Sequence, residues 1–356
     1  MHDALETIAD KLRKAAEQGR PLRVRGGGTK DFYGQLLHGE LLDTRPLAGI
    51  EAYEPSELVV TVGAGTRLLD LQARLAENGQ YLPFEPPQFG TSSTVGGMVA
   101  AGLAGPARAS VGGVREHVLG VQMLNGRGEL LKFGGQVMKN VAGYDVSRLM
   151  AGSLGTLGVI VQVTLKVLPL PPAECTLLFD LSETSARQQL NRWCSQPLPI
   201  NASCWSGGQL AVRLRGARAA IESAQRSMGG SALEPERATR QWAAVRDQSL
   251  SSFRLAPGEA LWRVSVPDTA TPLNLGPTLI EWHGALRWLR LPPQAAPQVR
   301  AAAARAGGHA TLFRGGDERA LVFTPLPPAL ARIHAQLKQA FDPAGILNLG
   351  RLSPDF

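Results

Sequence analysis

Two glycine-rich segments within the first hundred residues have the composition of a backbone anion site. One segment reads Arg25-Gly26-Gly27-Gly28-Thr29-Lys30, and the other reads Thr94-Val95-Gly96-Gly97. Successive main-chain amides in such a turn form a concave nest for an anion, and glycine permits both the backbone angles and a close approach. The second segment also begins a predicted helix of small residues, whose N-terminus favours negative charge. Each segment alone is more often a plain tight turn, but together they predict a site for a diphosphate.

The common phosphate-binding motifs do not fit this sequence. The chain has no G-x-x-x-x-G-K-[ST] segment, and the stretch Gly63-Ala64-Gly65-Thr66-Arg67-Leu68 lacks the third glycine of the Rossmann fingerprint. A P-loop protein and a Rossmann dinucleotide fold are therefore both disfavoured.

Side chains that could do chemistry are few, and none identifies a catalytic residue. His117 precedes a predicted strand, where a structural histidine is the commoner interpretation. Asp145 begins an apolar helix and fits an N-cap as well as a cofactor contact, and Tyr144 fits a structural aromatic as well as a ring contact. The second half of the chain holds one dense set of aromatic and basic residues. These residues could bind a carboxylate substrate or could simply lie on an exposed strand face: Trp205, Trp262, Trp282, His283, Trp288 and Arg290.

The composition is typical of a globular protein with a substantial core. Hydrophobic residues make up 44% of the 356 residues and charged residues 19%. The net charge of +7 is dispersed, which favours a solvated surface plus an anion site over nucleic-acid binding. The three cysteines, Cys175, Cys194 and Cys204, include no C-x-x-C pair, so no metal site, disulfide framework or iron–sulfur cluster is expected. No apolar run could span a membrane and no secretory signal is present, which predicts a cytoplasmic location.

Hydrophobic periodicity and turn residues predict an α+β protein. The helices expected before residue 170 lie at 4–18 and 67–77, and the strands at 22–25, 47–53, 58–62, 118–124, 130–133 and 159–168. Pro169-Leu170-Pro171-Pro172 is the best linker candidate. Beyond it, an antiparallel sheet covered by helices is expected, with strands near 175–180, 209–214, 260–266, 285–291 and 309–314 and helices near 184–194, 217–228 and 293–306. A final helix is predicted at about 329–341.

The order of the glycine-rich and apolar segments resembles the flavin domain of the vanillyl-alcohol oxidase type, the PCMH-type FAD-binding domain. The segments that carry the resemblance are Arg25–Lys30, Val62–Thr66, Thr94–Met98, Val114–Gly120, Lys139–Asp145 and Gly152–Ile160. It covers residues 1 to about 172 and then 341–352, and the stretch 134–170 resembles the E-subunit family of glycolate oxidase in particular. The resemblance implies an FAD-binding domain at 1–172, a small α+β cap domain with an antiparallel sheet at 173–325, and a C-terminal helix and tail at 326–356 that returns to the FAD domain.

The resemblance also implies which residues contact FAD. The diphosphate would be held by Gly26, Gly27, Gly28, Thr29 and Lys30, with Arg25 also expected at the cofactor, and the diphosphate and ribityl region would also meet Thr94, Gly96 and Gly97. The flavin would be lined by Gly102, Gly105 and Ser110, the adenine or ring side would be bordered by Gly158, Val159 and Ile160, and Pro86 belongs to the same expected site.

Two positions depart from the family pattern, and the residue at position 30 bears on how the flavin is attached. Leu154 stands where the family usually has Glu, and Asn348-Leu349-Gly350 stands where it usually has Asn-Pro-Gly, which puts one polar contact and one turn in doubt. Covalent flavin in the family is attached through His or Cys, but position 30 is Lys and no Cys precedes Cys175. We therefore expect FAD to be bound non-covalently.

The function implied by the resemblance is that of an FAD-dependent oxidoreductase subunit in a complex that oxidises glycolate to glyoxylate. Its partners would be a larger FAD-binding subunit and an iron–sulfur subunit, and the complex would act on a small 2-hydroxy acid. Related flavin subunits carry an H-x-G-D-G-N-x-H type metal block, whereas the nearest stretch here, Gly307-Gly308-His309-Ala310, has one His, which fits dependence on partners. The complex could attach the chain peripherally to the inner face of the membrane. Two alternatives stay open: a self-sufficient FAD oxidoreductase acting on another small substrate, and an assembly subunit with weak or no flavin.

Overall fold

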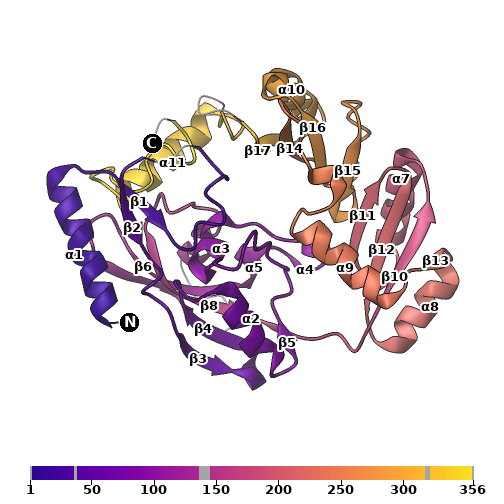
Figure 1. The fold of residues 1–356 in the computed structure, drawn as a ribbon, viewed down its shortest axis with the longest axis horizontal. Helices are drawn as coiled ribbons and strands as arrows, with labels where there is room; N and C mark the ends of the chain where they lie inside the picture. Colours follow the sequence, from indigo (N-terminus) through magenta and orange to yellow (C-terminus); the bar gives the residue numbers. More distant parts are fainter. Residues whose placement is uncertain (1, 36–37, 136–144, 317–320, 355–356) are drawn as a thin grey trace. The chain divides into compact units, whose positions relative to one another are not determined.

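The computed structural model describes residues 2–35, 38–135, 145–316 and 321–354 (Figure 1). The chain divides into two compact units. Unit 1 comprises Met1–Leu103, Gly113–Pro169 and Pro325–Phe356, and unit 2 comprises Ala104–Gly112 and Leu170–Thr324. The change of unit after Pro169 falls within the proline-rich segment, but the short excursion at 104–112 has no compositional signal in the sequence.

Unit 1 is built around a five-stranded antiparallel sheet in the order β3-β4-β8-β6-β7. Its strands are β3 (Ile50–Glu54), β4 (Val59–Gly63), β6 (Val118–Leu124), β7 (Leu130–Gly134) and β8 (Val159–Lys166). Two smaller pairs join β1 (Leu22–Arg25) to β2 (Glu40–Asp43) in parallel and β5 (Gln80–Tyr81) to β9 (Leu168–Pro169). Its helices are α1 (His2–Gln18), α2 (Leu68–Ala76), α3 (Val95–Ala101), α5 (Val114–His117), α6 (Val146–Leu149) and α11 (Pro328–Phe341), with one 3-10 turn, η1 (Pro55–Glu57).

The core of unit 1 joins the two ends of the chain. In α1, Ile8 and Leu12 recur at helical spacing, so both side chains lie on one face and are buried. They pack in one cluster with Val159 and Val161 of β8 and with Ile346 and Leu347 of the C-terminal tail. Leu347 also forms a parallel bridge to Leu22 of β1, so the tail lies directly beside the strand that leads into the first glycine segment.

Unit 2 is an eight-stranded antiparallel sheet with helices packed against it. The strand order is β13-β10-β12-β11-β15-β16-β14-β17. The strands are β10 (Ala173–Asp180), β11 (Ile200–Ser206), β12 (Gln209–Gly216), β13 (Ser231–Ala232), β14 (Ala260–Ser265), β15 (Thr278–Glu281), β16 (Leu286–Leu291) and β17 (His309–Arg314). The helices and 3-10 turns are α4 (Arg108–Val111), α7 (Glu183–Cys194), α8 (Arg218–Met228), α9 (Pro235–Arg246), α10 (Ala296–Arg305), η2 (Ser251–Phe253), η3 (Trp282–Gly284) and η4 (Pro293–Ala295). These two units give the α+β architecture that the sequence predicts.

Several elements of unit 2 have no clear periodic signal. The sequence of β11 is Ile-Asn-Ala-Ser-Cys-Trp-Ser, which is rich in small and polar residues. It is nevertheless a central strand, because it pairs with both β12 and β15, and Asn201 accepts a hydrogen bond from the buried Arg213 at 2.8 Å. Burial between neighbours decides strand formation here more than local propensity does.

Of the described helices, none is long and apolar enough to cross a membrane.

Candidate functional site

The first glycine segment follows β1 directly and forms a wall of a pocket in unit 1. Gly28 has φ +73°, and a Cβ at Gly27 would collide with the main-chain carbonyl oxygen of Ser92, so both positions require glycine. Within the described ranges, the amides of Gly27, Gly28 and Thr29 have no hydrogen-bond acceptor. Three successive amides of this kind are the donors that an anion takes in a backbone nest.

The second glycine segment also lines the pocket, but its amides already donate hydrogen bonds within the protein. Thr94 caps α3 by accepting a hydrogen bond from the Gly97 amide at 3.2 Å, while the Val95 and Gly96 amides donate to main-chain carbonyls of Thr66 and Ala64 at 2.9 and 2.8 Å. A Cβ at Gly96 would stand 2.7 Å from the Cβ of Ala64, so glycine is needed here for packing. The segment therefore shapes the pocket, and the free amides come from the first segment.

The two segments meet in a pocket with about 720 Å³ of space, part of it open to solvent. The lining includes eleven of the residues predicted from sequence: Arg25, Gly26, Gly27, Gly28, Thr29, Lys30, Thr94, Gly96, Gly97, Gly158 and Ile160. It also includes residues that the sequence did not single out as contacts: Val24, Asp31, Thr44, Ser93, Ala100, Ala101, Leu154, Gly155, Asn348 and Arg351.

Five predicted residues lie elsewhere in the structure, and four of them have an evident reason. Because side chains alternate along β8, Ile160 faces the pocket and Val159 packs into the core with α1. Gly102 ends α3 in the left-handed conformation that a helix C-cap favours. Gly105 and Ser110 belong to the 104–112 segment of unit 2, where they bond to Trp282 and Ile200, and Pro86 does not line the pocket.

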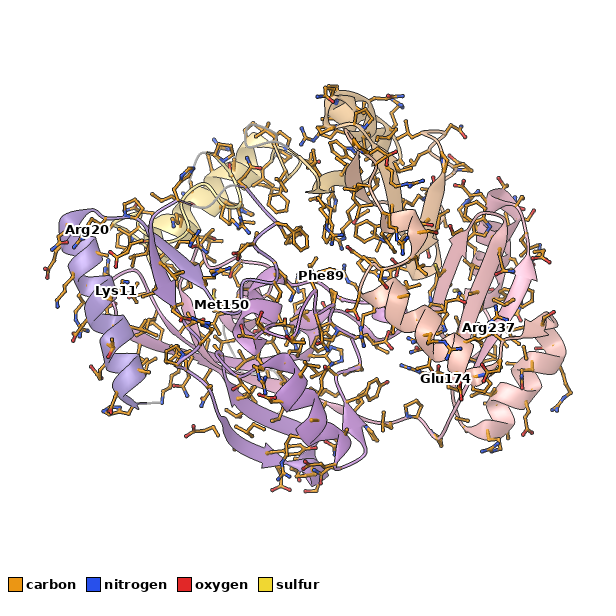
Figure 2. All side chains as sticks on the ribbon, in the orientation of Figure 1. Lys11, Arg20, Phe89, Met150, Glu174 and Arg237 are labelled. Atoms are coloured by element: carbon orange, nitrogen blue, oxygen red, sulfur yellow. The ribbon has the colours of Figure 1, made fainter. Side chains whose placement is uncertain are left out.

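Positive charge predominates among the side chains of the pocket. Lys30 donates from Nζ to the Ser93 hydroxyl at 2.9 Å, and its ammonium lies 5.8 Å from the ring centroid of Phe89, the residue labelled in Figure 2. Arg25 pairs with Asp31 at 2.7 Å, with both side chains partly exposed. Arg351 is only 4% exposed, and burial lowers its pKa to about 10, although Asp31 and Tyr33 act in the opposite direction. The described part of the pocket lining thus holds three cationic side chains and one carboxylate.

Leu154, the first position that departs from the family pattern, is bonded to Asn348 of the turn that contains the second, Leu349. Asn348 donates from Nδ2 to the main-chain oxygen of Leu154 at 2.6 Å and accepts the Val24 amide at 2.7 Å. The turn that contains Asn348, Leu349 and Gly350 is closed by the Arg351 amide, which donates to the Asn348 carbonyl at 3.1 Å. With φ +71° at Gly350, the turn forms without a proline.

The other candidates have structural roles in the described part of the chain. His117 is buried against Phe84 with its Nδ1 2.9 Å from the Gly113 carbonyl oxygen, and burial lowers its pKa. Asp145 caps α6, while Tyr144 lies outside the described residues. Trp288 donates to Glu281 at 2.7 Å, and Arg290 donates to the Arg254 carbonyl at 3.0 Å. Among the described side chains, no group of three or more His, Cys, Asp or Glu could hold a metal ion.

Comparisons with known proteins show that this chain is similar to flavoproteins. Residues 3–134 match the family model described as "FAD binding domain". The chain is 44% identical to the glycolate oxidase subunit GlcE of Escherichia coli (strain K12) over 351 aligned residues. These residues make up 98% of this chain and 97% of GlcE. The glycolate oxidase subunit GlcD of Bacillus subtilis (strain 168) is 30% identical over 186 residues, or 52% of this chain and 39% of GlcD.

A solved structure of alkyldihydroxyacetonephosphate synthase is similar in fold. The TM-score is 0.66 at 15% sequence identity, with 96% of this chain and 75% of that chain covered. At this identity the similarity concerns the fold alone, and it confirms the predicted α+β architecture with an FAD-binding domain. Since the similarity to GlcE extends over almost the full length of both proteins, the chain belongs to the GlcE family of glycolate oxidase subunits, among the flavoprotein oxidoreductases.

Proposed function

We propose that this chain binds one FAD non-covalently in the unit 1 pocket and works as a flavin subunit of a complex that oxidises glycolate to glyoxylate. The observation that carries the cofactor proposal is the run of amides at Gly27, Gly28 and Thr29 without acceptors in the described chain, in a pocket that Arg25, Lys30 and Arg351 also line. The similarity to GlcE over 98% of the chain supports the complex and its substrate.

The residues present fit a dinucleotide. The free amides of the first glycine segment would donate to the diphosphate, Lys30 and Arg25 would contribute charge at its rim, and the apolar side chains of Leu154 and Ile160 would pack against less polar parts of the cofactor. The described residues that line the pocket include no His or Cys, which supports a non-covalent flavin. Bound FAD would supply the acceptor for the two electrons that leave glycolate as it becomes glyoxylate.

Dependence on partners is supported by what the described residues lack. No described cluster could hold a metal ion, and the pocket lining includes no carboxylate except Asp31, which is paired with Arg25. A larger FAD-binding subunit and an iron–sulfur subunit would supply substrate activation and onward electron transfer. We place the complex in the cytoplasm because all three cysteines, Cys175, Cys194 and Cys204, are free thiols.

Flavin counting on the complex and on the isolated chain tests this proposal. We expect about one FAD per chain, released into the supernatant by acid precipitation, and little glycolate oxidation by the chain alone. Gly27→Ala should lose most of the FAD because its Cβ collides with the Ser92 carbonyl, whereas Gly135→Ala, with no atom within 4 Å of its Cβ, should retain it.

The alternative outcomes are distinct from one another. Flavin that stays with the acid precipitate would contradict the non-covalent mode, and strong glycolate oxidation by the isolated chain would contradict partner dependence. A colourless chain whose melting temperature does not rise with added FAD would instead indicate an assembly subunit, since binding to the native state must stabilise it.

A further inference from the structure

A buried ion pair between Lys338 and Asp342 holds the C-terminal tail after α11 in place. Lys338, in the last turn of α11, donates from Nζ to the Asp342 carboxylate at 2.7 Å and to the carbonyls of Thr156 and Leu347 at 2.9 and 2.6 Å. Asp342 in turn accepts the amides of Ile346 and Leu347 at 3.2 and 2.8 Å. This network holds the tail beside β1 and so fixes where the residues that follow enter the pocket.

Arg351, at the end of this tail, is a buried cation whose partners are neutral. Its guanidinium donates to the carbonyl of Asp31 at 2.9 Å, to that of Lys30 at 3.3 Å and to that of Gln35. The described residues give its Nε no acceptor, and a Cβ at Gly34 would stand 2.8 Å from that atom. The Asp31 carboxylate is already bonded to the guanidinium of Arg25. Burying a charge without a counter-ion of its own is costly, and the lowered pKa of Arg351 reflects that cost.

The position of this charge indicates its counter-ion. Two of the three carbonyls that Arg351 binds belong to Lys30 and Asp31, which directly follow the amides without acceptors at Gly27 to Thr29. Of the described residues that line the pocket, Arg25, Lys30 and Arg351 carry cationic side chains and Asp31 carries a carboxylate. A dinucleotide diphosphate carries two negative charges at neutral pH and, bound at these amides, would supply the counter-charge that Arg351 lacks among the described residues.

We propose that Arg351 completes the flavin site from the C-terminal end of the chain, as the buried positive charge that the FAD diphosphate neutralises, and that the Lys338–Asp342 pair positions it. The proposal rests on the proposed function, because it assumes that the ligand is FAD. A purely structural arginine would tether loop 30–35 to the tail equally well, but its removal would weaken the binding of all flavins alike.

Binding of FAD and of riboflavin to the full-length apoprotein separates these two roles, because riboflavin has the ring and ribityl chain but no diphosphate. Arg351→Gln keeps hydrogen-bond donors and removes the charge, and Arg351→Lys keeps the charge. We expect Arg351→Gln to weaken FAD binding by about tenfold or more and riboflavin binding by less than about twofold. Arg351→Lys should stay within about threefold of the wild type for both. Arg74→Gln is the control, because Arg74 is an exposed arginine of α2 that pairs with Glu77.

A second variant covers the case in which Arg351→Gln fails to fold. Asp31→Asn removes the one carboxylate of the pocket lining from a side chain that is 40% exposed. The lining then carries one negative charge fewer, so FAD should bind several-fold more tightly while the binding of riboflavin is unchanged. Equal effects on both flavins in either variant would overturn the role of Arg351. No binding of FAD to the wild type would instead overturn the proposed function, so the two failures are distinguishable.

Discussion

At the scale of single residues, backbone strain marks the end of β15 in unit 2. Trp282, His283 and Gly284 all have left-handed backbone, with φ of 52°, 58° and 114°. Such angles cost energy for residues other than glycine and persist where side chains over-determine them. Here the His283 ring lies between two hydroxyls, with Nδ1 3.0 Å from Ser203 Oγ and Nε2 3.2 Å from Ser110 Oγ. His283 therefore ties the 104–112 segment to the sheet of unit 2.

The same residue predicts how stability depends on pH. Burial lowers the pKa of His283, although nearby Asp268 acts to raise it, so the folded state binds its proton at lower pH than an unfolded chain does. Stability should thus fall as pH drops below about 6.5, by at most about 1.4 kcal/mol per pH unit for one histidine. His283→Asn, which tolerates left-handed backbone, should flatten this dependence in urea titrations between pH 6.5 and 5. His2→Asn, at an exposed position of α1, should not. An unchanged slope in His283→Asn would show that this ring does not titrate with folding.

At the scale of elements, local patterns identify most helices and strands but not the contacts that join distant parts. The 3.6-residue period of α1, the Asn125-Gly126-Arg127-Gly128 turn between β6 and β7, and the apolar run of β8 are all local signals. The glycine segment after β1 is also a local signal in the sequence, although the steric need for glycine at position 27 comes from the distant Ser92 carbonyl. Arg351 could not be predicted as a pocket residue, because the carbonyls it binds lie more than 300 positions earlier in the chain.

The Lys338–Asp342 pair shows the same limit and gives a prediction for α11. Its i,i+4 spacing is typical of an exposed pair on a helix surface, yet both side chains are buried. Lys338→Met should lower the free energy of unfolding by about 3–5 kcal/mol, because it leaves the Asp342 carboxylate buried without its cation. Lys11→Met is a matched control, since Lys11 pairs with Glu40 at 2.6 Å on the surface, and it should cost less than about 1 kcal/mol. Comparable losses in the two variants, measured by urea denaturation, would argue against a buried pair.

At the scale of the whole molecule, the two units have separate hydrophobic cores, and the pocket proposed for FAD lies in unit 1. Among the described residues, one buried cluster of unit 1 joins α1, β8 and the C-terminal tail, whereas unit 2 has clusters around Leu210 and Val212 and around Trp262 and Val264. Ligand binding stabilises only the states that can bind it, so its effect should be greatest where the pocket is built.

Hydrogen exchange measured by mass spectrometry can show this difference within one sample. At an FAD concentration of about 100 times the dissociation constant, binding contributes about 2.7 kcal/mol to the native state. Exchange should then slow in residues 24–31, whose free amides gain acceptors, and together with them in residues 342–351, because the tail is bonded to the same loop. The edge of the unit 2 sheet formed by β13, β10 and β12 should exchange as before. If FAD slowed exchange in the glycine segment but not in residues 342–351, Arg351 would not belong to the flavin site. A charge that neutralises the diphosphate should become less mobile when the ligand binds, and exchange in the tail around it should slow.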